Sequence, residues 1–228
     1  MKFKHIHFRE RIIALAKRLS RKHIVMLVVV GVVVVAGLTV WWVKSRNTIA
    51  QQKHPEVVTV STDEPSRIKP EDEGYVWRGG PNDPKQLIVE SIGVEAYVQK
   101  VAVEQNRRVA VPSNIYLTGW FTESARPGES GLSIIDGHIV DQSDQGIFTR
   151  LNELKPGDTF QVRMGDGSEK NFEVLKNDTV DTAKAEATLF SQEPKVQSQL
   201  NLITCGGTYD SVSKSYDKRV IVQAEFVQ

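Results

Sequence analysis

Residues 202–207 read Leu-Ile-Thr-Cys-Gly-Gly, and this stretch contains Cys205, the only cysteine in the 228-residue chain. The apolar run that begins at Leu200 predicts a β-strand, and the two glycines directly after the cysteine predict a turn. A second strand-forming run, Arg-Val-Ile-Val at residues 219–222, follows a short polar connection. We therefore expect an antiparallel hairpin in which Arg219 returns beside Cys205.

The strand pattern of this hairpin extends upstream through the C-terminal part of the chain. Gly-Asp-Gly at residues 165–167 is typical of a hairpin turn, and short helices are expected at residues 147–154 and 183–192. The expected strands are residues 87–89, 94–98, 115–121, 132–135, 159–163, 172–175, 200–205 and 220–227. Many short strands with little helix predict a mainly β domain, either one sandwich or a small closed barrel.

The N-terminal part of the chain has a different pattern. Residues 24–43 carry no charge and contain the pair Trp41-Trp42, and a helix of this length spans the roughly 30 Å of a bilayer core. Eight Lys and Arg precede this run against a single Glu, which predicts a cytoplasmic N-terminus. We expect an uncleaved transmembrane anchor, and a cleaved signal peptide is the alternative.

These patterns divide the chain into four parts. They are a basic cytoplasmic tail at residues 1–23, a transmembrane signal-anchor at 24–43, an extracytoplasmic stalk at 44–74 and a folded domain at 75–228. The stalk is polar and contains three prolines, which is typical of a linker. Tyr-Val-Trp at residues 75–77 stands where the stalk meets the domain, and it either docks on the domain or lies over its active site.

Charge and cysteine content exclude some functions. Residues 44–228 hold 21 of the 29 basic and 27 of the 28 acidic side chains, so no basic stripe is present and nucleic-acid binding is not expected. No dense acidic cluster indicates a metal ion, and no pattern indicates a cofactor. Extracellular cysteines usually come in pairs. Cys205 is therefore either a buried structural residue or a thiol kept for chemistry.

A reactive thiol needs a neighbouring base or positive charge, because the thiolate is the nucleophile. After the anchor, His54 lies in the stalk, whereas His138 ends the run Ile-Ile-Asp-Gly-His. Beside Cys205, His138 can accept and return the proton of an acyl transfer. Asp136 and Asp141 flank His138, and they either tune it or are solvated loop carboxylates.

Strand alternation gives Arg219 a place in the same chemistry. The more apolar face of each C-terminal strand should fill the core, so Cys205 and Arg219 are both expected to point outward, toward a surface groove. A guanidinium group there can stabilise the oxyanion that forms when a thiolate attacks a carbonyl. The alternative is an ordinary surface arginine that pairs with Asp210 or Asp217.

The ordered set of residues resembles the sortases, and the resemblance covers residues 75–228. It is carried by Pro-Gly-Glu-Ser-Gly at 127–131, Gly137-His138, Leu-Asn-Glu-Leu-Lys-Pro-Gly-Asp at 151–158, the cysteine stretch at 202–207 and Tyr-Asp-Lys-Arg-Val at 216–220. Gly-Trp-Phe at residues 119–121 and the Thr-Cys-Gly-Gly ending are most similar to class F sortases.

The resemblance implies an eight-stranded closed β-barrel with short helices, preceded by a single transmembrane helix. It implies a cysteine transpeptidase that cleaves a sorting signal similar to Leu-Pro-X-Thr-Gly without a metal ion or other cofactor. In this scheme Cys205 attacks the threonine carbonyl to form a thioester, His138 protonates the leaving amine, and Arg219 holds the oxyanion. Thr204 is expected to position the substrate, and residues 178–199 to form one wall of the groove.

The implied partners are surface proteins with a C-terminal sorting signal, an amine acceptor on a peptidoglycan precursor or a pilin, and membrane lipid around the N-terminal helix. The expected location is a bacterial cell membrane, with a single pass and an extracellular catalytic domain. Two other functions fit the same residues. One is a cysteine endopeptidase that hydrolyses surface proteins, and the other is a non-catalytic binding module on a stalk.

Overall fold

The computed structural model describes residues 65–103, 109–139, 145–213 and 215–227, together with positions 25–26, 30–31, 34–35, 37 and 39. It forms two compact units, Met1–His54 and Pro55–Gln228. The expected tail, the stalk up to residue 64 and most of the expected anchor lie outside the described residues. The described part of the chain contains no helix with the length and apolar character that a membrane crossing requires.

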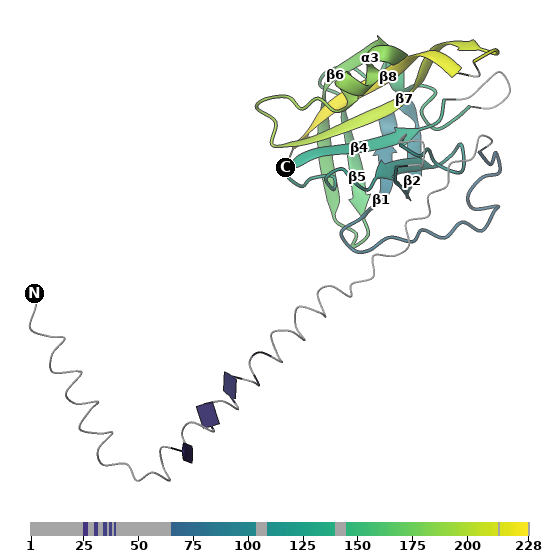
Figure 1. Cartoon of the computed structure of the whole chain (residues 1–228). Helices are drawn as coiled ribbons and strands as arrows, with labels where there is room; N and C mark the ends of the chain where they lie inside the picture. Colours follow the sequence, from purple (N-terminus) through teal and green to yellow (C-terminus); the bar gives the residue numbers. More distant parts are fainter. Residues whose placement is uncertain are drawn as a thin grey trace, which may run out of the picture. The chain divides into compact units, whose positions relative to one another are not determined.

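The larger unit is a closed eight-stranded β-barrel, as expected (Figure 1). Around the barrel the strand order is β1-β2-β3-β4-β7-β8-β6-β5, and β5 pairs with β1 to close it. The strands are β1 (Pro84–Val89), β2 (Val94–Val101), β3 (Thr118–Phe121), β4 (Gly131–Gly137), β5 (Thr159–Met164), β6 (Glu169–Asp181), β7 (Ser198–Asp210) and β8 (Ser215–Val227). Among the residues that the structure describes, one short helix, α3 (Thr182–Leu189), and two 3₁₀ turns, η1 (Glu90–Ile92) and η2 (Leu151–Glu153), accompany the strands of this unit.

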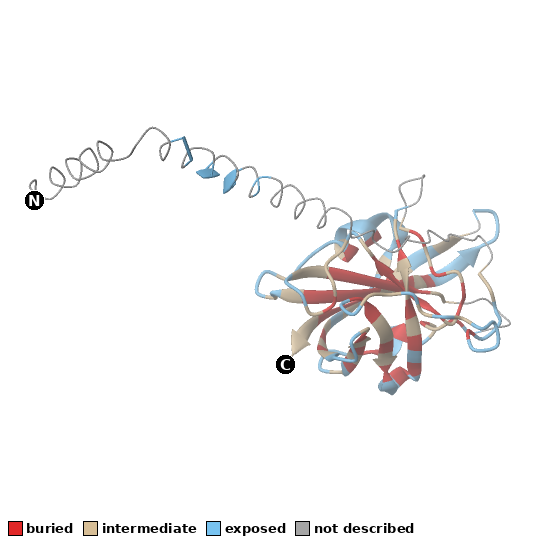
Figure 2. Cartoon of the chain, turned by 90° about the horizontal axis from the view of Figure 1, so that it is seen from below, coloured by how far each residue is buried: buried red, intermediate tan, exposed pale blue. Residues whose placement is uncertain are grey.

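Side-chain alternation along the strands fills the barrel with apolar residues. In β1, β2, β5 and part of β6, buried positions recur with exposed or half-buried positions between them, whereas β3 and parts of β4, β7 and β8 are buried over consecutive residues (Figure 2). Phe160 and Phe172 stack at 5.5 Å between ring centroids, and Phe172 also contacts Phe226 edge-on. Leu200 and Leu202 are completely buried in this core. The β7 alternation predicted from the sequence is therefore confirmed.

A second apolar cluster lies apart from the barrel core and involves α3. It contains Phe121, Ile134, Ala185, Leu189 and Ile221, with Ile203 packed against it. Its members come from strands β3, β4, β7 and β8 as well as from the helix. Figure 1 shows α3 at the β6 and β8 side of the barrel, in agreement with the contacts between these elements. The strand faces that carry Ile134, Ile203 and Ile221 are thus covered in part by a helix.

The segment after α3 is fixed to β7 and β8 by buried amide side chains. Asn201 donates from Nδ2 to the carbonyl of Leu189 at 2.7 Å, and Gln199 donates from Nε2 to the carbonyl of Ser191 at 3.0 Å. Gln223 donates to the Ser191 hydroxyl at 2.9 Å. The helix predicted at residues 183–192 therefore ends at Leu189, because the carbonyls that follow accept hydrogen bonds from β7 rather than continuing the helix.

Two expectations about local structure are wrong. The helix predicted at residues 147–154 is a series of turns with only η2 in 3₁₀ form. The amide of Phe148 donates to the carbonyl of His138 instead, and both Phe148 and Leu151 are completely buried. The turn expected at Gly206-Gly207 is a strand irregularity, since β7 continues to Asp210 and its register with β8 shifts after Gly206. Gly207 has φ +78°, which suits glycine.

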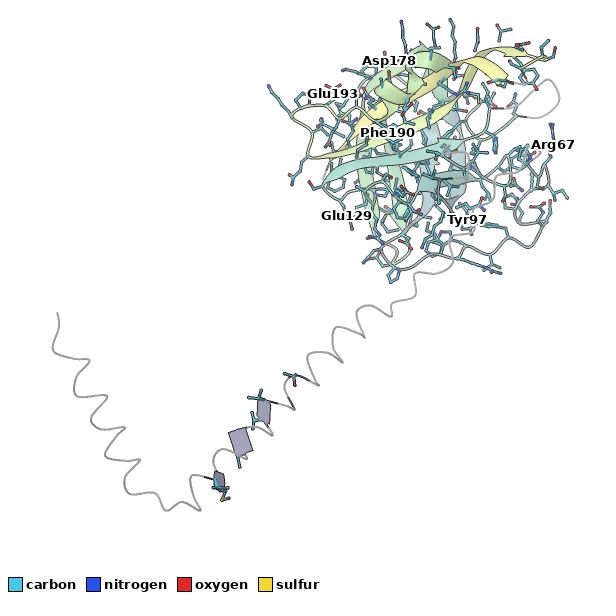
Figure 3. The ribbon with its side chains drawn as sticks, in the orientation of Figure 1. Arg67, Tyr97, Glu129, Asp178, Phe190 and Glu193 are labelled. Atoms are coloured by element: carbon cyan, nitrogen blue, oxygen red, sulfur yellow. The ribbon has the colours of Figure 1, made fainter. Side chains whose placement is uncertain are left out.

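Trp77 and Tyr75 dock on the barrel exterior, which was one of the two alternatives for this segment. The Trp77 indole donates to the carbonyls of Val98 at 3.1 Å and Pro84 at 3.3 Å. The Tyr75 ring lies 5.7 Å from that of Tyr97 on β2, a residue labelled in Figure 3. Burial raises the pKa of Tyr75 to about 12. This segment is therefore part of the packed domain.

Candidate active site

A pocket of about 300 Å³ opens where strands β3, β4, β7 and β8 face the end of α3. Apolar side chains form most of its wall, and polar groups from the end of β4 and from within β7 and β8 complete it. The lining residues are Val109, Val111, Gly119, Phe121, Ile134, Asp136, Gly137, His138, Leu189, Ile203, Thr204, Cys205 and Arg219. All four site residues predicted from the sequence therefore line one pocket. Leu189 also lines the pocket, and it belongs to residues 178–199, the segment expected to form one wall of the groove.

Cys205 and Arg219 are direct cross-strand partners in the β7–β8 ladder. The hairpin that brings them together is the one predicted from the sequence. Cys205 is half-buried. Burial raises the pKa of its thiol, the nearby Arg219 guanidinium lowers it, and the Asp136 carboxyl raises it. The arginine thus favours the thiolate, and burial opposes it.

The Arg219 guanidinium is anchored at the base of the hairpin. Its Nη1 donates to the carbonyls of Lys218 at 2.7 Å and Tyr216 at 2.9 Å, and to the Thr182 hydroxyl at 3.2 Å. The alternative pairing with Asp210 or Asp217 does not occur. These carboxylates accept hydrogen bonds from the amides of Val212 and Thr208, respectively.

His138 follows β4 and lies at the end of the pocket. Its Nε2 is 2.7 Å from the carbonyl oxygen of Pro112. A carbonyl can only accept a hydrogen bond, so Nε2 carries the proton in the neutral ring. Nδ1 is then the nitrogen that can take a proton from a reacting group. Burial lowers the pKa of His138, and the hydrogen bond to Pro112 partly opposes this. The ring is therefore neutral near pH 7 and suited to act as a base.

Thr204 connects the strand of the cysteine to the strand of the histidine. Its buried hydroxyl donates to the carbonyl of Gly137 at 2.7 Å. This bond accounts for a threonine directly before the cysteine. The expected role of Thr204 in binding the substrate stays a prediction.

From the sequence, Asp136 is expected either to tune His138 or to be a solvated loop carboxylate. The second of these alternatives is wrong. The residue lies in β4 with only 9% of its surface exposed, and its carboxyl lines the pocket. Burial raises the pKa of this carboxyl well above its ordinary value. Strand alternation could have placed Asp136 in the site, because residues 134, 136 and 138 are alternate positions and are expected to share one face. Asp141 lies outside the described residues.

Nucleophile, base and guanidinium together can carry out acyl transfer through the thiol. The described segments contain no group of three or more His, Cys, Asp or Glu side chains that could hold a metal ion. The pocket therefore holds a cysteine together with the neutral imidazole of His138, the positive charge of Arg219 and the buried carboxyl of Asp136, in largely apolar surroundings.

The match to a family model agrees with this chemistry. The family model described as the Sortase domain matches residues 87–227. Sortase A from Corynebacterium diphtheriae, in a lid mutant, is 19% identical, with 66% of this chain and 73% of that chain covered and a TM-score of 0.49. Sortase C-1 from Actinomyces oris is 23% identical, with 70% and 82% covered and a TM-score of 0.48. Comparison with curated proteins gave no match.

Proposed function

This chain belongs to the sortase family of cysteine transpeptidases, and we propose that Cys205, His138 and Arg219 cleave a sorting signal similar to Leu-Pro-X-Thr-Gly. The observation that carries the proposal is the meeting of these three side chains in one pocket of about 300 Å³. Its apolar wall, which includes Phe121 and Leu189, suits the apolar start of such a signal.

The first half of the proposed reaction forms a thioester. The Cys205 thiolate attacks the threonine carbonyl, and a carbon–sulfur bond forms as the carbon–nitrogen bond to glycine breaks. His138 first removes the thiol proton and then gives it to the departing amine. The negative charge that develops on the carbonyl oxygen is stabilised by the Arg219 guanidinium.

The second half transfers the acyl group to an amine. The amine attacks the thioester, His138 takes its proton, and the thiol is restored. We propose that the acyl donor is a surface protein with a C-terminal sorting signal. The acceptor amine belongs to a peptidoglycan precursor or a pilin. Assignment to class F rests on Gly-Trp-Phe at residues 119–121 and on the Thr-Cys-Gly-Gly ending.

The proposed location is the outer face of a bacterial membrane. Residues 24–43 supply an uncharged run of the required length, and the basic residues before it favour a cytoplasmic N-terminus. A single pass would then hold the barrel outside the cell, near newly exported proteins.

Full-length protein in detergent, incubated with a Leu-Pro-X-Thr-Gly peptide and triglycine, tests the proposal. Mass spectrometry should find the ligated peptide and a covalent acyl-enzyme whose mass is absent from Cys205→Ala. Hydrolysed peptide without ligation, for every amine tried, would favour the endopeptidase alternative. Absence of both products would favour the binding module.

A further inference from the structure

Asp136 carries a buried carboxyl group that the proposed mechanism does not use. Its Oδ1 has no hydrogen-bond partner within the described part of the chain. Buried polar groups in folded proteins are nearly always paired, so an unpaired one calls for an explanation. This group lines the pocket that also contains Cys205 and His138. A ligand in that pocket can supply the missing partner.

The fold keeps open the space that the carboxyl occupies. Asp136 is paired across the β3–β4 ladder with Gly119. A Cβ atom at residue 119 would overlap Asp136 Oδ1 and would approach Val101 and Pro112 closely. The absence of a side chain at Gly119 therefore makes room for a carboxyl oxygen, Oδ1, that has no hydrogen-bond partner in the described residues.

The Asp136 carboxyl lies on the same face of the sheet as Cys205, level with the residue two positions before Cys205 on β7. Asp136 pairs with Ile203 in the parallel β4–β7 ladder, and Cys205 is two residues further along β7. Two strand residues span about 7 Å. That distance suits a side chain that contacts the peptide residue whose carbonyl is attacked at Cys205.

Burial and the groups around this carboxyl favour its protonated form. His138 directly after β4, Cys205 on β7 and Arg219 on β8 line the same pocket, and Gly119 on β3 carries no charge. Burial is the largest influence on the pKa of Asp136 and raises it, with only its own backbone amide opposing. A protonated carboxyl donates a hydrogen bond, so its natural partner is an oxygen acceptor.

We propose that Asp136 is a substrate-binding residue that donates a hydrogen bond to an oxygen of the peptide residue acylated onto Cys205. This inference rests on the proposed function. The oxygen belongs either to the side-chain hydroxyl of that residue, which is threonine in the proposed signal, or to the peptide backbone. Both sources share the same chemistry, and two peptides distinguish them.

The test uses full-length protein and compares Asp136→Asn with Asp136→Ala. The asparagine variant keeps a donor of nearly the same shape, and the alanine variant has none. We expect kcat/KM for the threonine peptide to fall about tenfold or more in Asp136→Ala and to be largely retained in Asp136→Asn. The ratio of Asp136→Asn to wild-type activity should rise with pH, because only the wild type can lose this proton.

A peptide with valine in place of threonine identifies the acceptor. If the hydroxyl accepts the bond, the wild type prefers threonine and Asp136→Ala loses the preference. If the backbone accepts it, Asp136→Ala slows both peptides equally. Either result supports the proposal.

Ser133→Ala is the matched control. Its hydroxyl is also buried on β4 without a hydrogen-bond partner in the described residues, but it does not line the pocket. This variant should leave kcat/KM unchanged. None of the three variants should lower Tm by much, since neither Asp136 Oδ1 nor the Ser133 hydroxyl has a hydrogen-bond partner to lose in the described residues.

The inference about Asp136 is overturned if Asp136→Ala keeps full activity, or if Asp136→Asn and Asp136→Ala lose activity equally. In either case, activity of the wild type with the threonine peptide still supports the proposed function. Loss of Tm in step with loss of activity also overturns the inference about Asp136, because that pattern indicates a structural role. A wild type that reacts with neither peptide overturns the proposed function and this inference together.

Discussion

Thr204 on β7 donates a hydrogen bond to the carbonyl oxygen of Gly137 on β4, at 2.7 Å. Each of these two residues directly precedes a predicted site residue, Cys205 within β7 and His138 just after the end of β4. The bond therefore sets the spacing between nucleophile and base at the point where the β4–β7 ladder ends. It is buried, so water cannot replace it when it is broken.

Thr204→Val should reduce both stability and activity. The change keeps the shape of the side chain but removes the donor, which costs about 1–3 kcal/mol when a buried acceptor is left unpaired. We expect a lower Tm and a kcat that falls by at most about tenfold. Thr204→Ser should be close to the wild type in both. Thermal unfolding and steady-state kinetics measure the two effects. A rise in KM alone would instead support the substrate-binding role predicted for Thr204.

Arg219→Gln should make the Cys205 thiol less acidic. The guanidinium lowers the pKa of Cys205 against the larger, opposing influence of burial, so its removal raises that pKa. At any pH below the pKa the thiolate fraction falls, by about tenfold for each unit of the rise. The rate of alkylation by iodoacetamide as a function of pH measures this.

Lys218→Gln is the control for this experiment. It removes the same charge from the neighbouring residue of β8, whose side chain is exposed. An equal slowing in both variants would mean that general surface charge, and not the position of Arg219, controls the thiol.

Gly119→Ala should destabilise the barrel and damage the site. The added methyl group would overlap the Asp136 carboxyl and lie 2.9 Å from Val101 Cγ1 and 3.2 Å from Pro112 Cγ. Overpacking of this kind costs about 1–3 kcal/mol. A shift of Pro112 would also move the carbonyl that orients His138. We expect lower Tm and lower kcat/KM.

Gly80→Ala provides the comparison, because its methyl group would meet only the Asp83 carboxyl, at 3.3 Å or more. It should have little effect on either quantity. If Gly119→Ala behaves in the same way, the close packing described around Gly119 is not important.

Trp77→Ala should lower stability without changing the kinetics. The indole donates to barrel carbonyls of β1 and β2, and Trp77 does not line the pocket. Loss of a half-buried tryptophan costs about 2–4 kcal/mol. Chemical denaturation and kcat/KM for the threonine peptide measure the two properties. A higher kcat/KM in the variant would show that the segment obstructs the site, as a lid does.

The partly covered strand face near the site is a feature that no local pattern predicted. Phe190, labelled in Figure 3, follows α3, and its ring lies edge-on to Phe121 at 6.4 Å. Buried Asn201 and Gln199 fix this segment to β7. In the sequence these amides look like outward-facing polar positions of a strand. Their partners are backbone carbonyls ten or so residues away, so only the folded chain explains their burial.

The sequence by itself predicted most of the strands and the β7–β8 hairpin, and it singled out Cys205, His138 and Arg219 as candidate site residues. Alternation, turn residues and a single thiol are local features, and strand pairing follows from them. The tertiary structure alone decided the tautomer of His138, the anchoring of Arg219 and the raised pKa of Asp136. Each of these depends on burial and on partners from distant segments, because desolvation and hydrogen bonding act through space and not along the chain.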